Sequence, residues 1–547
     1  MFRMTAPVAE RGSARSRGGG IGRAAVLIGA ITMLARVIGF GRQVVFAHTV
    51  QASCLGTAYT TANMVPNIIY DIVAGGALTA VVVPVLAGPA MAALAADREQ
   101  ARQISSALLS WAVLLLVPVS ALVALIARPL VSVLLGGTPG CPRAAMVAMS
   151  ARMLETFAPQ ILLYGLAVVL YGVLQSHRRF AAPALAPVLS SAVVIGAYFW
   201  FGVTGNGYQD MFRPVPTLAW VVLAVGTTVG VAALVATPLI PAARLRLRLR
   251  PTLAFPAGVG TRVRSLAVAG VATLIAQDAS VAVVIVLANS RGGSGALVLY
   301  SFAWAVFFVP YAVLAVPIAT SAFPELSARD DRFDATSASS TRAVIVASWL
   351  GVAGMAGTCV PLARVFQSHA GQSADARQLA IALVAFAPGL VGYGLTANLS
   401  RVLYAYGRSR AAALAVSGGW LAVIALDLLI VPFVGRSSVV PWLGAGTSIG
   451  LTGAGVALLI LVRRACGPDA LRGGARAAVA GLAGAVAGTA AGLAVALGIP
   501  VAGFLPNVAS TILTSAAVLV AFFAVVALVD GGDLRAVLRR VKPGTKG

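Results

Sequence analysis

The chain has 547 residues, of which 59% are hydrophobic and only 10% are charged, and its mean hydropathy is +0.93. This composition excludes a soluble globular protein and indicates a polytopic membrane protein. The formal charge of +24 would suggest nucleic-acid binding in a soluble chain. In a membrane protein, basic cytoplasmic loops that face anionic lipid account for it, so we expect membrane lipids and no nucleic acid as partners.

Apolar runs long enough to cross about 30 Å of hydrocarbon as helices recur along the whole chain. We therefore predict an all-α integral membrane fold with about fourteen transmembrane helices. The predicted spans are residues 24–47, 57–88, 104–127, 149–175, 181–202, 218–240, 264–288, 295–320, 342–362, 378–403, 410–432, 440–462, 476–498 and 505–529. Most arginines outside these spans fall in the alternate loops that share a side with both termini, which predicts that both termini are cytoplasmic.

An internal repeat divides the chain. The stretch that begins at Phe157 resembles the one that begins at Phe386, with matches at FAP, YGL and VL. An even number of helices separates the two copies, so they have the same orientation and predict two pseudo-symmetric six-helix lobes. The predicted units are a disordered cytoplasmic tail at 1–23, an N-lobe at 24–240, a basic linker at 241–263, a C-lobe at 264–462, a cytoplasmic loop at 463–475, two further helices at 476–529 and a basic tail at 530–547.

The four cysteines, at 54, 141, 359 and 466, form no CxxC pair and have no nearby histidine cluster. They predict neither a zinc site nor a redox motif. We expect them to be small apolar packing residues.

Two arginines stand inside the first apolar span, TMLARVIGFGRQVVFA, at Arg36 and Arg42. An arginine at the centre of a bilayer helix costs roughly 2.5 to 3.5 kcal/mol, so the pair indicates either a functional site or a structural pairing with Asp71 or Glu155. Because the planar guanidinium matches phosphate and carboxylate oxygens, the functional alternative is an anion site, for example for a pyrophosphate.

Glycine and proline next to these residues predict bent helices and close helix contact. The candidate flexible positions are Gly39, Gly41, Pro66, Gly75 and Gly76. Further polar residues at membrane depth are candidate site residues for the same reason as the arginines. They are Asp71, Gln277, Asp278, Asn398, Arg401 and Asp427.

The first span, followed by TAYTTANMVPNIIYDIVAGGALTAVVVPVLA, resembles the N-terminal signature of the MurJ (MviN) family, the lipid II flippases of the MOP transporter superfamily. QSHRRFAAPALAPVLSSAV at 175–193 and GAGTSIGLT at 444–452 also resemble family segments. The resemblance covers roughly residues 24–462. It implies a protein of the bacterial inner membrane that moves lipid II to the outer leaflet by alternating access, with a cavity between the lobes and a groove for the polyprenyl tail on the last two helices.

The resemblance also implies roles for single residues. Arg36 and Arg42 match cavity arginines that the family uses for the anionic headgroup, and Asn67 and Asp71 are expected beside them. Four positions depart from the family pattern. Many members have Asp at the position of Thr57, Arg at that of Tyr70 and Arg near those of Trp304 and Ala305. We expect Arg401 to compensate for part of the lost positive charge.

Some relatives bind a cation between two carboxylates and a hydroxyl. Here Asp278, Asp427 and Thr447 would supply oxygen ligands suited to Na⁺ as a coupling cation. Equally, each aspartate could be a satisfied helix-packing residue.

Two alternatives to a lipid II flippase remain open from the sequence. One is another MOP-type carrier, either a polysaccharide-precursor flippase or a drug/cation antiporter. Another is a non-transporting scaffold that recruits cell-wall synthesis proteins. An enzyme is not expected, because the histidines and the carboxylates outside the membrane are scattered.

Overall fold

The computed structural model describes residues 18–72, 95–177, 179–245, 250–255, 259–367, 373–499 and 501–541. In these ranges the regular elements are helices. Those of the N-lobe are α1 (Gly18–Thr49), α2 (Cys54–Tyr70), α4 (Ala95–Leu125), α5 (Ala127–Leu135), α6 (Arg143–Phe157), α7 (Pro159–Ser176), α8 (Ala181–Thr204) and α9 (Thr217–Ala243).

The second half continues in the same way. The helices of the C-lobe are α10 (Val259–Leu287), η2 (Ala288–Gly292), α11 (Ala296–Pro310), η3 (Tyr311–Ala315), α12 (Val316–Ala328), α13 (Phe333–Gly357), α14 (Cys359–Phe366), α15 (Ser373–Phe386), α16 (Gly389–Ala405), α17 (Ser409–Ile430), η4 (Val431–Phe433), η5 (Arg436–Ser438) and α18 (Val439–Cys466). The C-terminal elements are η6 (Asp469–Leu471), α19 (Gly474–Gly498) and α20 (Phe504–Val541).

The helices agree with an all-α membrane protein. Eleven of the described helices are long and apolar enough to cross a membrane, or up to 13 if each of two bent pairs counts as one span. The expected span at 57–88 is covered only by α2, because residues 73–94 lie outside the described part. Several helices extend beyond the expected spans: α1 begins at Gly18, inside the expected tail, α4 begins at Ala95, α13 begins at Phe333, and α20 continues to Val541.

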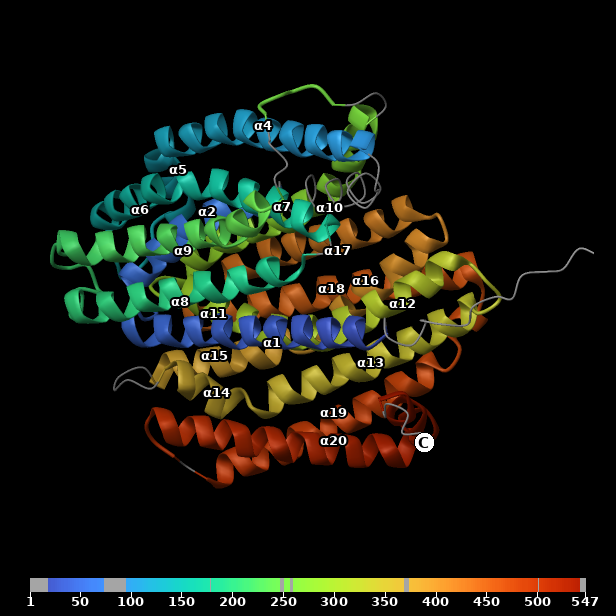
Figure 1. The fold of residues 1–547 in the computed structure, drawn as a ribbon. Coiled ribbons are helices and arrows are strands. Elements are labelled where there is room, and N and C mark those ends of the chain that lie inside the picture. The colour runs from blue at the N-terminus through green and yellow to red at the C-terminus, as the bar shows by residue number, and fades with distance from the viewer. Residues whose placement is uncertain are drawn as a thin grey trace, which may run out of the picture.

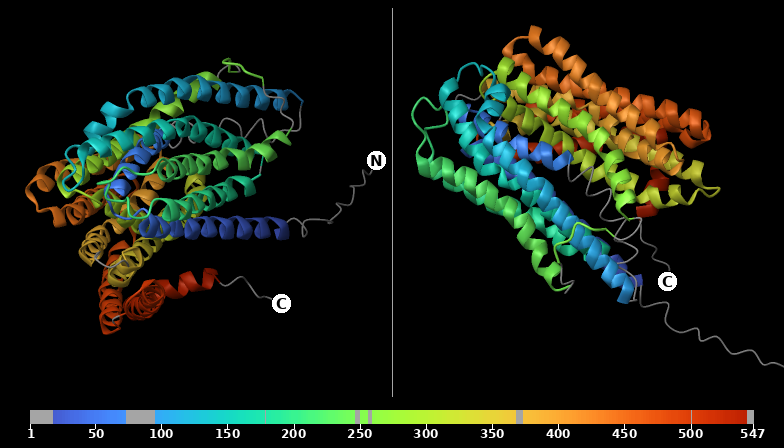
Figure 2. Two further views of the ribbon diagram at one scale, coloured as in Figure 1. Left: turned by 90° about the vertical axis from the view of Figure 1, so that its left-hand side faces the viewer. Right: turned by 90° about the horizontal axis from the view of Figure 1, so that it is seen from above.

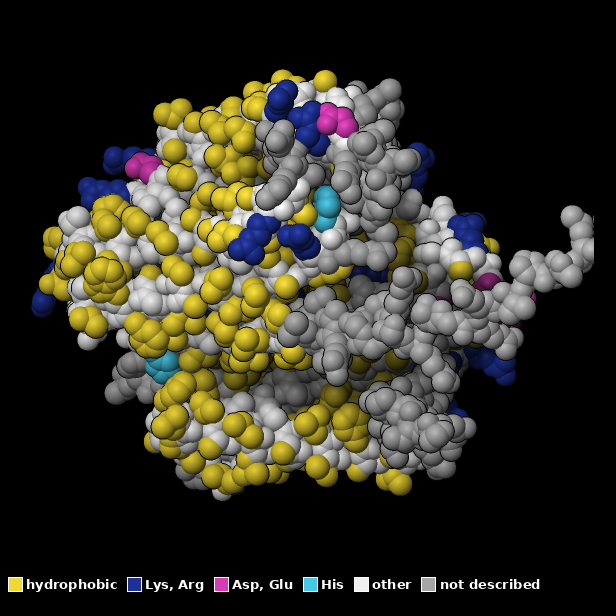
Figure 3. All heavy atoms as spheres, in the orientation of Figure 1, with side chains coloured by type: hydrophobic (Ala, Val, Ile, Leu, Met, Phe, Trp, Pro, Cys, Tyr) yellow, Lys and Arg dark blue, Asp and Glu magenta, His cyan; other side chains and the backbone are white. Residues whose placement is uncertain are grey.

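The long helices run roughly parallel to one another (Figure 1). Helices α8 and α9 pack together and against α1 and α7, whereas α18 packs against α15, α16 and α17. Helices α19 and α20 pack on each other and on α13, and they lie at one edge of the molecule (Figures 1 and 2). The face in Figure 3 is dominated by hydrophobic side chains, as expected for helices that contact lipid.

The FAP repeat coincides with a helix break in each half. Pro159 begins α7 directly after α6 ends, and Pro388 precedes the first residue of α16 after α15 ends at Phe386. The axes of α15 and α16 differ by 43°. Proline has no N–H to donate and its ring clashes with the preceding turn, so the repeated motif interrupts the helix at equivalent points.

The expectation for the cysteines was wrong at two positions. Cys54, at the start of α2, and Cys141, in the loop between α5 and α6, form a disulfide with Cα atoms 5.7 Å apart. They are 87 residues apart in the sequence. No local pattern marks such a pair, because only the packing of α2 against α5 and α6 brings them together. Cys359 is a buried free thiol, as expected for a packing residue.

Candidate functional site

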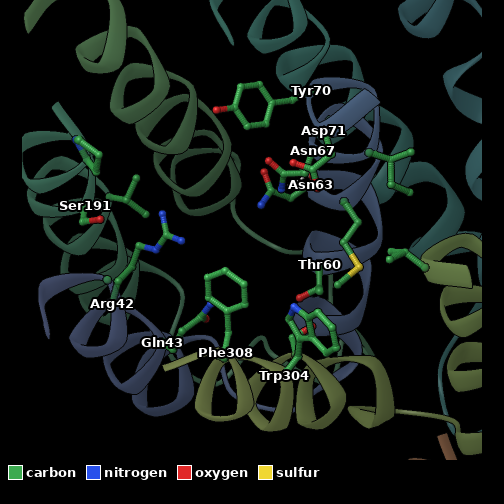
Figure 4. Close-up of a pocket in the computed structure, with 18 of the residues that line it drawn as sticks. Arg42, Gln43, Thr60, Asn63, Asn67, Tyr70, Asp71, Ser191, Trp304 and Phe308 are labelled. Atoms are coloured by element: carbon green, nitrogen blue, oxygen red, sulfur yellow. Dashed lines mark hydrogen bonds between the residues drawn. The ribbon is translucent and has the colours of Figure 1, made fainter. Parts of the chain in front are cut away.

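A cavity of about 890 Å³ lies between the helices of the two halves. This volume is near the upper end of the range for small-molecule pockets, roughly 300 to 1,000 Å³. Helices α1, α2, α7, α8 and α9 line it from the N-lobe, and α10, α11, η3, α16 and α17 line it from the C-lobe. Figure 4 shows its polar side chains on α1, α2 and α8 and two of its aromatic side chains on α11.

Both arginines of the first span line this cavity. Arg42 points into it from α1, on the side of Ser191 (Figure 4). The guanidinium carbon of Arg36 lies 5.2 Å from the ring centre of Phe308 on α11, a cation–π distance. Among the described residues, neither guanidinium is paired with Asp71 or Glu155. The structural pairing that the sequence left open is therefore absent from this part of the chain.

The wall formed by α2 carries neutral and acidic groups. Asn67 donates a 2.9 Å hydrogen bond to the carbonyl of Asn63 and accepts one of 3.0 Å from Tyr164. Asp71 follows the last residue of α2 and lines the cavity on the same side (Figure 4). The side-chain oxygen of Asn63 is buried without a hydrogen-bond partner in the described residues. This wall offers hydrogen bonds and one carboxylate to a ligand.

The candidate flexible residues lie in or near the same region. Gly39 lines the cavity, and a Cβ atom at Gly39 or Gly41 would meet no atom of the described residues within 4 Å. Helix α1 runs through both glycines without a break. The expected close helix contact stays a prediction, because much of the neighbouring second span lies outside the described residues. Pro66 is buried inside α2. Gly75 and Gly76 lie outside the described residues.

The departures from the family pattern fall in two places. Tyr70 lines the cavity and packs on Tyr164, with ring centres 4.5 Å apart, and Trp304 and Ala305 line it from α11. Thr57 lies outside the cavity lining. Its hydroxyl accepts a 2.9 Å hydrogen bond from the backbone N–H of Gly295.

The C-lobe side of the cavity is formed largely by aromatic side chains, of which the sequence reasoning named only Trp304, as a departure from the family pattern. We call this set the aromatic wall: Tyr300, Trp304, Phe308, Tyr311, Tyr393 and Trp420. Trp304 is at its centre, 6.4 Å from the ring centres of both Tyr393 and Trp420. The sequence does show large aromatic residues in helices otherwise built from small residues, and this could have marked them as candidates. Which of these aromatic residues line the cavity together depends on the tertiary structure.

The expected cation ligands are only partly brought together. Asp427, on α17, is buried with both carboxylate oxygens unpartnered among the described residues, and a Cβ added to Gly446 would overlap one of them. Thr447 follows that glycine, and the Tyr300 hydroxyl interacts with both Asp427 and Thr447. Asp278 instead lines the cavity, close enough to Asp71 for their charges to interact.

Arg401 does not reach the cavity lining. Its guanidinium donates a 2.5 Å hydrogen bond to the carbonyl of Ala397 in its own helix. It lies close enough to Tyr311 and Tyr404 for charge interactions. The basic residues in the described lining are thus Arg36 and Arg42, opposed by the carboxylates of Asp71 and Asp278.

The two lobes are joined beyond the cavity, on the side of the disulfide. Asn289 of η2 is fully buried and donates hydrogen bonds of 2.9 Å to Thr61 and 3.0 Å to the carbonyl of Leu134. Gly295 adopts a φ of +78° and donates to Thr57, and a Cβ there would overlap the backbone of Ala52. We call these contacts the seal. They hold the two lobes together at this end.

Comparison with protein families matches residues 46–524 to the family described as "Lipid II flippase MurJ". The lipid II flippase MurJ of Burkholderia cenocepacia is 27% identical over 320 residues, which are 56% of this chain and 57% of that protein. The probable lipid II flippase MurJ of Synechocystis is 26% identical over 241 residues, 42% of each chain. The aligned regions thus span about half the length of these relatives.

Solved structures share the fold. A structure described as lipid II flippase MurJ in an inward closed conformation superposes with a TM-score of 0.70 at 18% identity, covering 94% of this chain and 100% of that one. An inward-facing multidrug resistance MATE transporter of the MOP superfamily gives 0.63 at 14% identity, with 80% and 97% covered. At these identities the likeness shows the fold alone.

Proposed function

The chain belongs to the MurJ lipid II flippase family, and from this premise we propose that it moves lipid II from the cytoplasmic to the outer leaflet of the bacterial inner membrane. The observation that carries the proposal is the cavity between the lobes with Arg36 and Arg42 on one wall, neither of them paired with an acidic side chain among the described residues. An arginine fork binds phosphate oxygens with two parallel hydrogen bonds. The pyrophosphate of the substrate therefore lies against α1.

The cavity lowers the cost of moving a polar headgroup across hydrocarbon. Each hydrogen-bonding group left unsatisfied in the bilayer core would cost several kcal/mol. Arg42, Asn63 and Ser191 offer polar partners inside the protein instead. The prenyl tail stays in lipid, along the apolar exposed faces of α19 and α20. An inside-negative potential favours outward movement of an anion by about 2.3 kcal/mol per charge per 100 mV.

Alternating access requires the seal to open and close. In the proposed cycle the lobes rock about the cavity, so that the hydrogen bonds from Asn289 and Gly295 break when the cavity opens on the disulfide side. We place both termini in the cytoplasm. The position of the Cys54–Cys141 disulfide, at the end of α1 opposite its N-terminal residues, supports this orientation, because disulfides persist on the oxidising side of the membrane.

A Na⁺ ion is the candidate coupling cation. Asp427 and Thr447 fit it, because a buried carboxylate without a hydrogen-bond partner and a hydroxyl are hard oxygen ligands. Bound there, the ion would neutralise a buried charge between α17 and α18. Asp278 lies on the cavity wall and is kept only as a second candidate ligand. Among the described residues, no group of three or more His, Cys, Asp or Glu side chains is placed to hold a metal.

The test is complementation in a bacterial strain depleted of its own flippase, scored as lipid II accessible at the outer surface. Wild type should restore accessibility, and Arg42→Ala and Arg36→Ala should reduce it at least tenfold at equal abundance. Arg213→Ala is the matched control, because Arg213 is exposed in a loop outside the cavity. If the control and the two cavity variants behave alike, the arginines do not bind the headgroup.

The second candidate is another MOP-type carrier. The carboxylates of Asp71 and Asp278 favour it, because they balance the two arginines and leave the cavity without an excess of positive charge. If the folded wild type fails to restore lipid II accessibility while a purified preparation transports an organic cation, this alternative replaces the flippase. Failure of both would leave a scaffold role, tested by co-purification of cell-wall synthesis proteins.

A further inference from the structure

The cavity has two chemically different sides. Its cations are both on α1, and the wall across the lobe interface is built from Tyr300, Trp304, Phe308, Tyr311, Tyr393 and Trp420. Figure 4 shows Arg42 on one side and the rings of Trp304 and Phe308 on α11. A pyrophosphate occupies only the region around the arginines, so a cavity of about 890 Å³ leaves the aromatic wall to another part of the ligand.

The rings of the aromatic wall form a continuous surface. Trp304 and Tyr300 are nearly parallel, at 7°, with ring centres 6.5 Å apart. Tyr393 continues the surface from Trp304, and its ring centre lies 3.9 Å from that of Tyr311 at an interplanar angle of 23°. Packing against one another holds these rings in place before any ligand binds, which reduces the entropy lost on binding.

The wall is apolar on its faces and polar at its edges. All its members except Phe308 carry an O–H or N–H group. The Tyr300 hydroxyl interacts with Asp427 and Thr447, and the hydroxyls of Tyr311 and Tyr393 interact with each other. The indole N–H groups of Trp304 and Trp420 donate to no side chain or backbone atom among the described residues, yet both residues line the cavity. A purely hydrocarbon ligand such as a prenyl chain would leave these donors unsatisfied, which disfavours it as the occupant.

We propose that the aromatic wall binds the pyranose rings of a lipid-linked sugar, with Trp304 as the central stacking residue. A pyranose ring presents C–H groups on its faces and hydroxyl groups at its rim, which matches aromatic faces bordered by hydrogen-bond donors. The inference rests on the proposed flippase function and deepens it. The N-lobe selects the pyrophosphate and the C-lobe selects the sugar, so both lobes must contact the same ligand.

The position of the arginines fixes the direction of the ligand. Arg36 lies over the ring of Phe308, at the border between the cationic and aromatic regions. A pyrophosphate held by Arg36 and Arg42 therefore places the attached sugar next to Phe308 and toward Trp304. Aromatic stacking is then the contact that the C-lobe makes with the headgroup.

The experiment compares two probes on purified protein in detergent: lipid II, and undecaprenyl pyrophosphate, which has no sugar. Dissociation constants are measured by titration with native mass spectrometry. Trp304→Ala should weaken binding of lipid II about tenfold and leave binding of undecaprenyl pyrophosphate unchanged, whereas Trp304→Phe should retain most of the affinity for lipid II. Trp200→Ala, at an exposed position on α8, is the matched control and should change neither.

The same data separate this inference from the proposed function. Arg42→Ala should weaken both probes by a similar factor, since both carry a pyrophosphate. If Trp304→Ala weakens both probes equally, or if wild type binds undecaprenyl pyrophosphate as tightly as lipid II, the aromatic wall does not bind sugar. If wild type binds neither probe, the flippase proposal fails and the inference fails with it. If only the Arg42→Ala effect is missing, the sugar site stands and the arginine role is refuted.

Discussion

Thr57→Val should open the seal while leaving the size of the side chain unchanged. Thr57 is fully buried, and its hydroxyl accepts the hydrogen bond from the N–H of Gly295 that joins the two lobes. Valine cannot accept it, so the N–H of Gly295 would be buried without a partner. Once the lobes separate, water satisfies that group in wild type and variant alike. The penalty therefore applies only to the sealed state.

Leaving a buried N–H unsatisfied costs about 1 to 3 kcal/mol. If the sealed state dominates in wild type, this shifts the equilibrium toward the open state by about 5- to 150-fold. The other hydrogen bond of the hydroxyl, to the carbonyl of Ser53, lies within the same helix end and does not cross the lobe interface. The effect is thus assigned to one interlobe contact.

The assay measures how fast a membrane-impermeant maleimide labels a cysteine in the cavity. Ala305→Cys provides the thiol, because Ala305 lines the cavity, and Cys359→Ser with Cys466→Ser removes the free thiols while keeping the disulfide. Added on the disulfide side of the membrane, the reagent should label the cavity thiol about 5- to 150-fold faster when Thr57→Val is present.

The matched control is Thr237→Val, since the hydroxyl of Thr237 donates only to the carbonyl of Ala233 in its own helix. Equal labelling rates in wild type and Thr57→Val would refute the idea that this bond holds the lobes together. Equal acceleration by Thr57→Val and Thr237→Val would instead indicate general loosening of the helices.

Three further predictions concern stability. Cys54→Ser removes the disulfide that closes an 87-residue loop and should lower the unfolding free energy by about 2 to 5 kcal/mol. Its melting temperature in detergent should be lower than that of the control Cys466→Ser. Equal melting temperatures would contradict a structural role of the disulfide. The melting temperature of wild type should be higher in sodium chloride than in choline chloride, because a bound ion stabilises the folded state. The melting temperature of Asp427→Asn should be the same in both salts. A sodium effect that persists in Asp427→Asn would exclude Asp427 as a ligand. Gly392→Ala would push a Cβ into the backbone of α18 and should lower the unfolding free energy by about 1 to 3 kcal/mol. Gly453→Ala is the control, because its Cβ would meet no atom of the described residues within 4 Å. Similar melting temperatures of the two variants would refute the tight crossing of α16 and α18.

Most of the helix positions were predictable from the sequence, because hydropathy is a local property. Long apolar runs, and Pro159 and Pro388 in the repeated FAP motif, specify where helices form and break without reference to partners. The location of Arg36 and Arg42 in a cavity was predictable for a similar reason. A permanent charge within an apolar span has to face protein or water, whatever the rest of the chain does.

Contacts between distant helices were decided only by the tertiary structure. Which residues meet depends on how each helix is rotated and which neighbour it packs against, and neither is encoded in local periodicity. The Cys54–Cys141 disulfide, the hydrogen bond from Gly295 to Thr57, and the packing of Arg36 on Phe308 all arise in this way.

Helix rotation and packing also explain which candidate site residues lie together in the cavity and which do not. Asp278 and Asp427 are both buried with carboxylate oxygens that have no hydrogen-bond partner among the described residues, but Asp278 lines the cavity whereas Asp427 packs against α18. Arg401 bonds to its own helix and stays out of the cavity lining. The aromatic wall assembles from α11, η3, α16 and α17. By itself the sequence determined which residues cannot face lipid, and packing between helices decided which of them face one another.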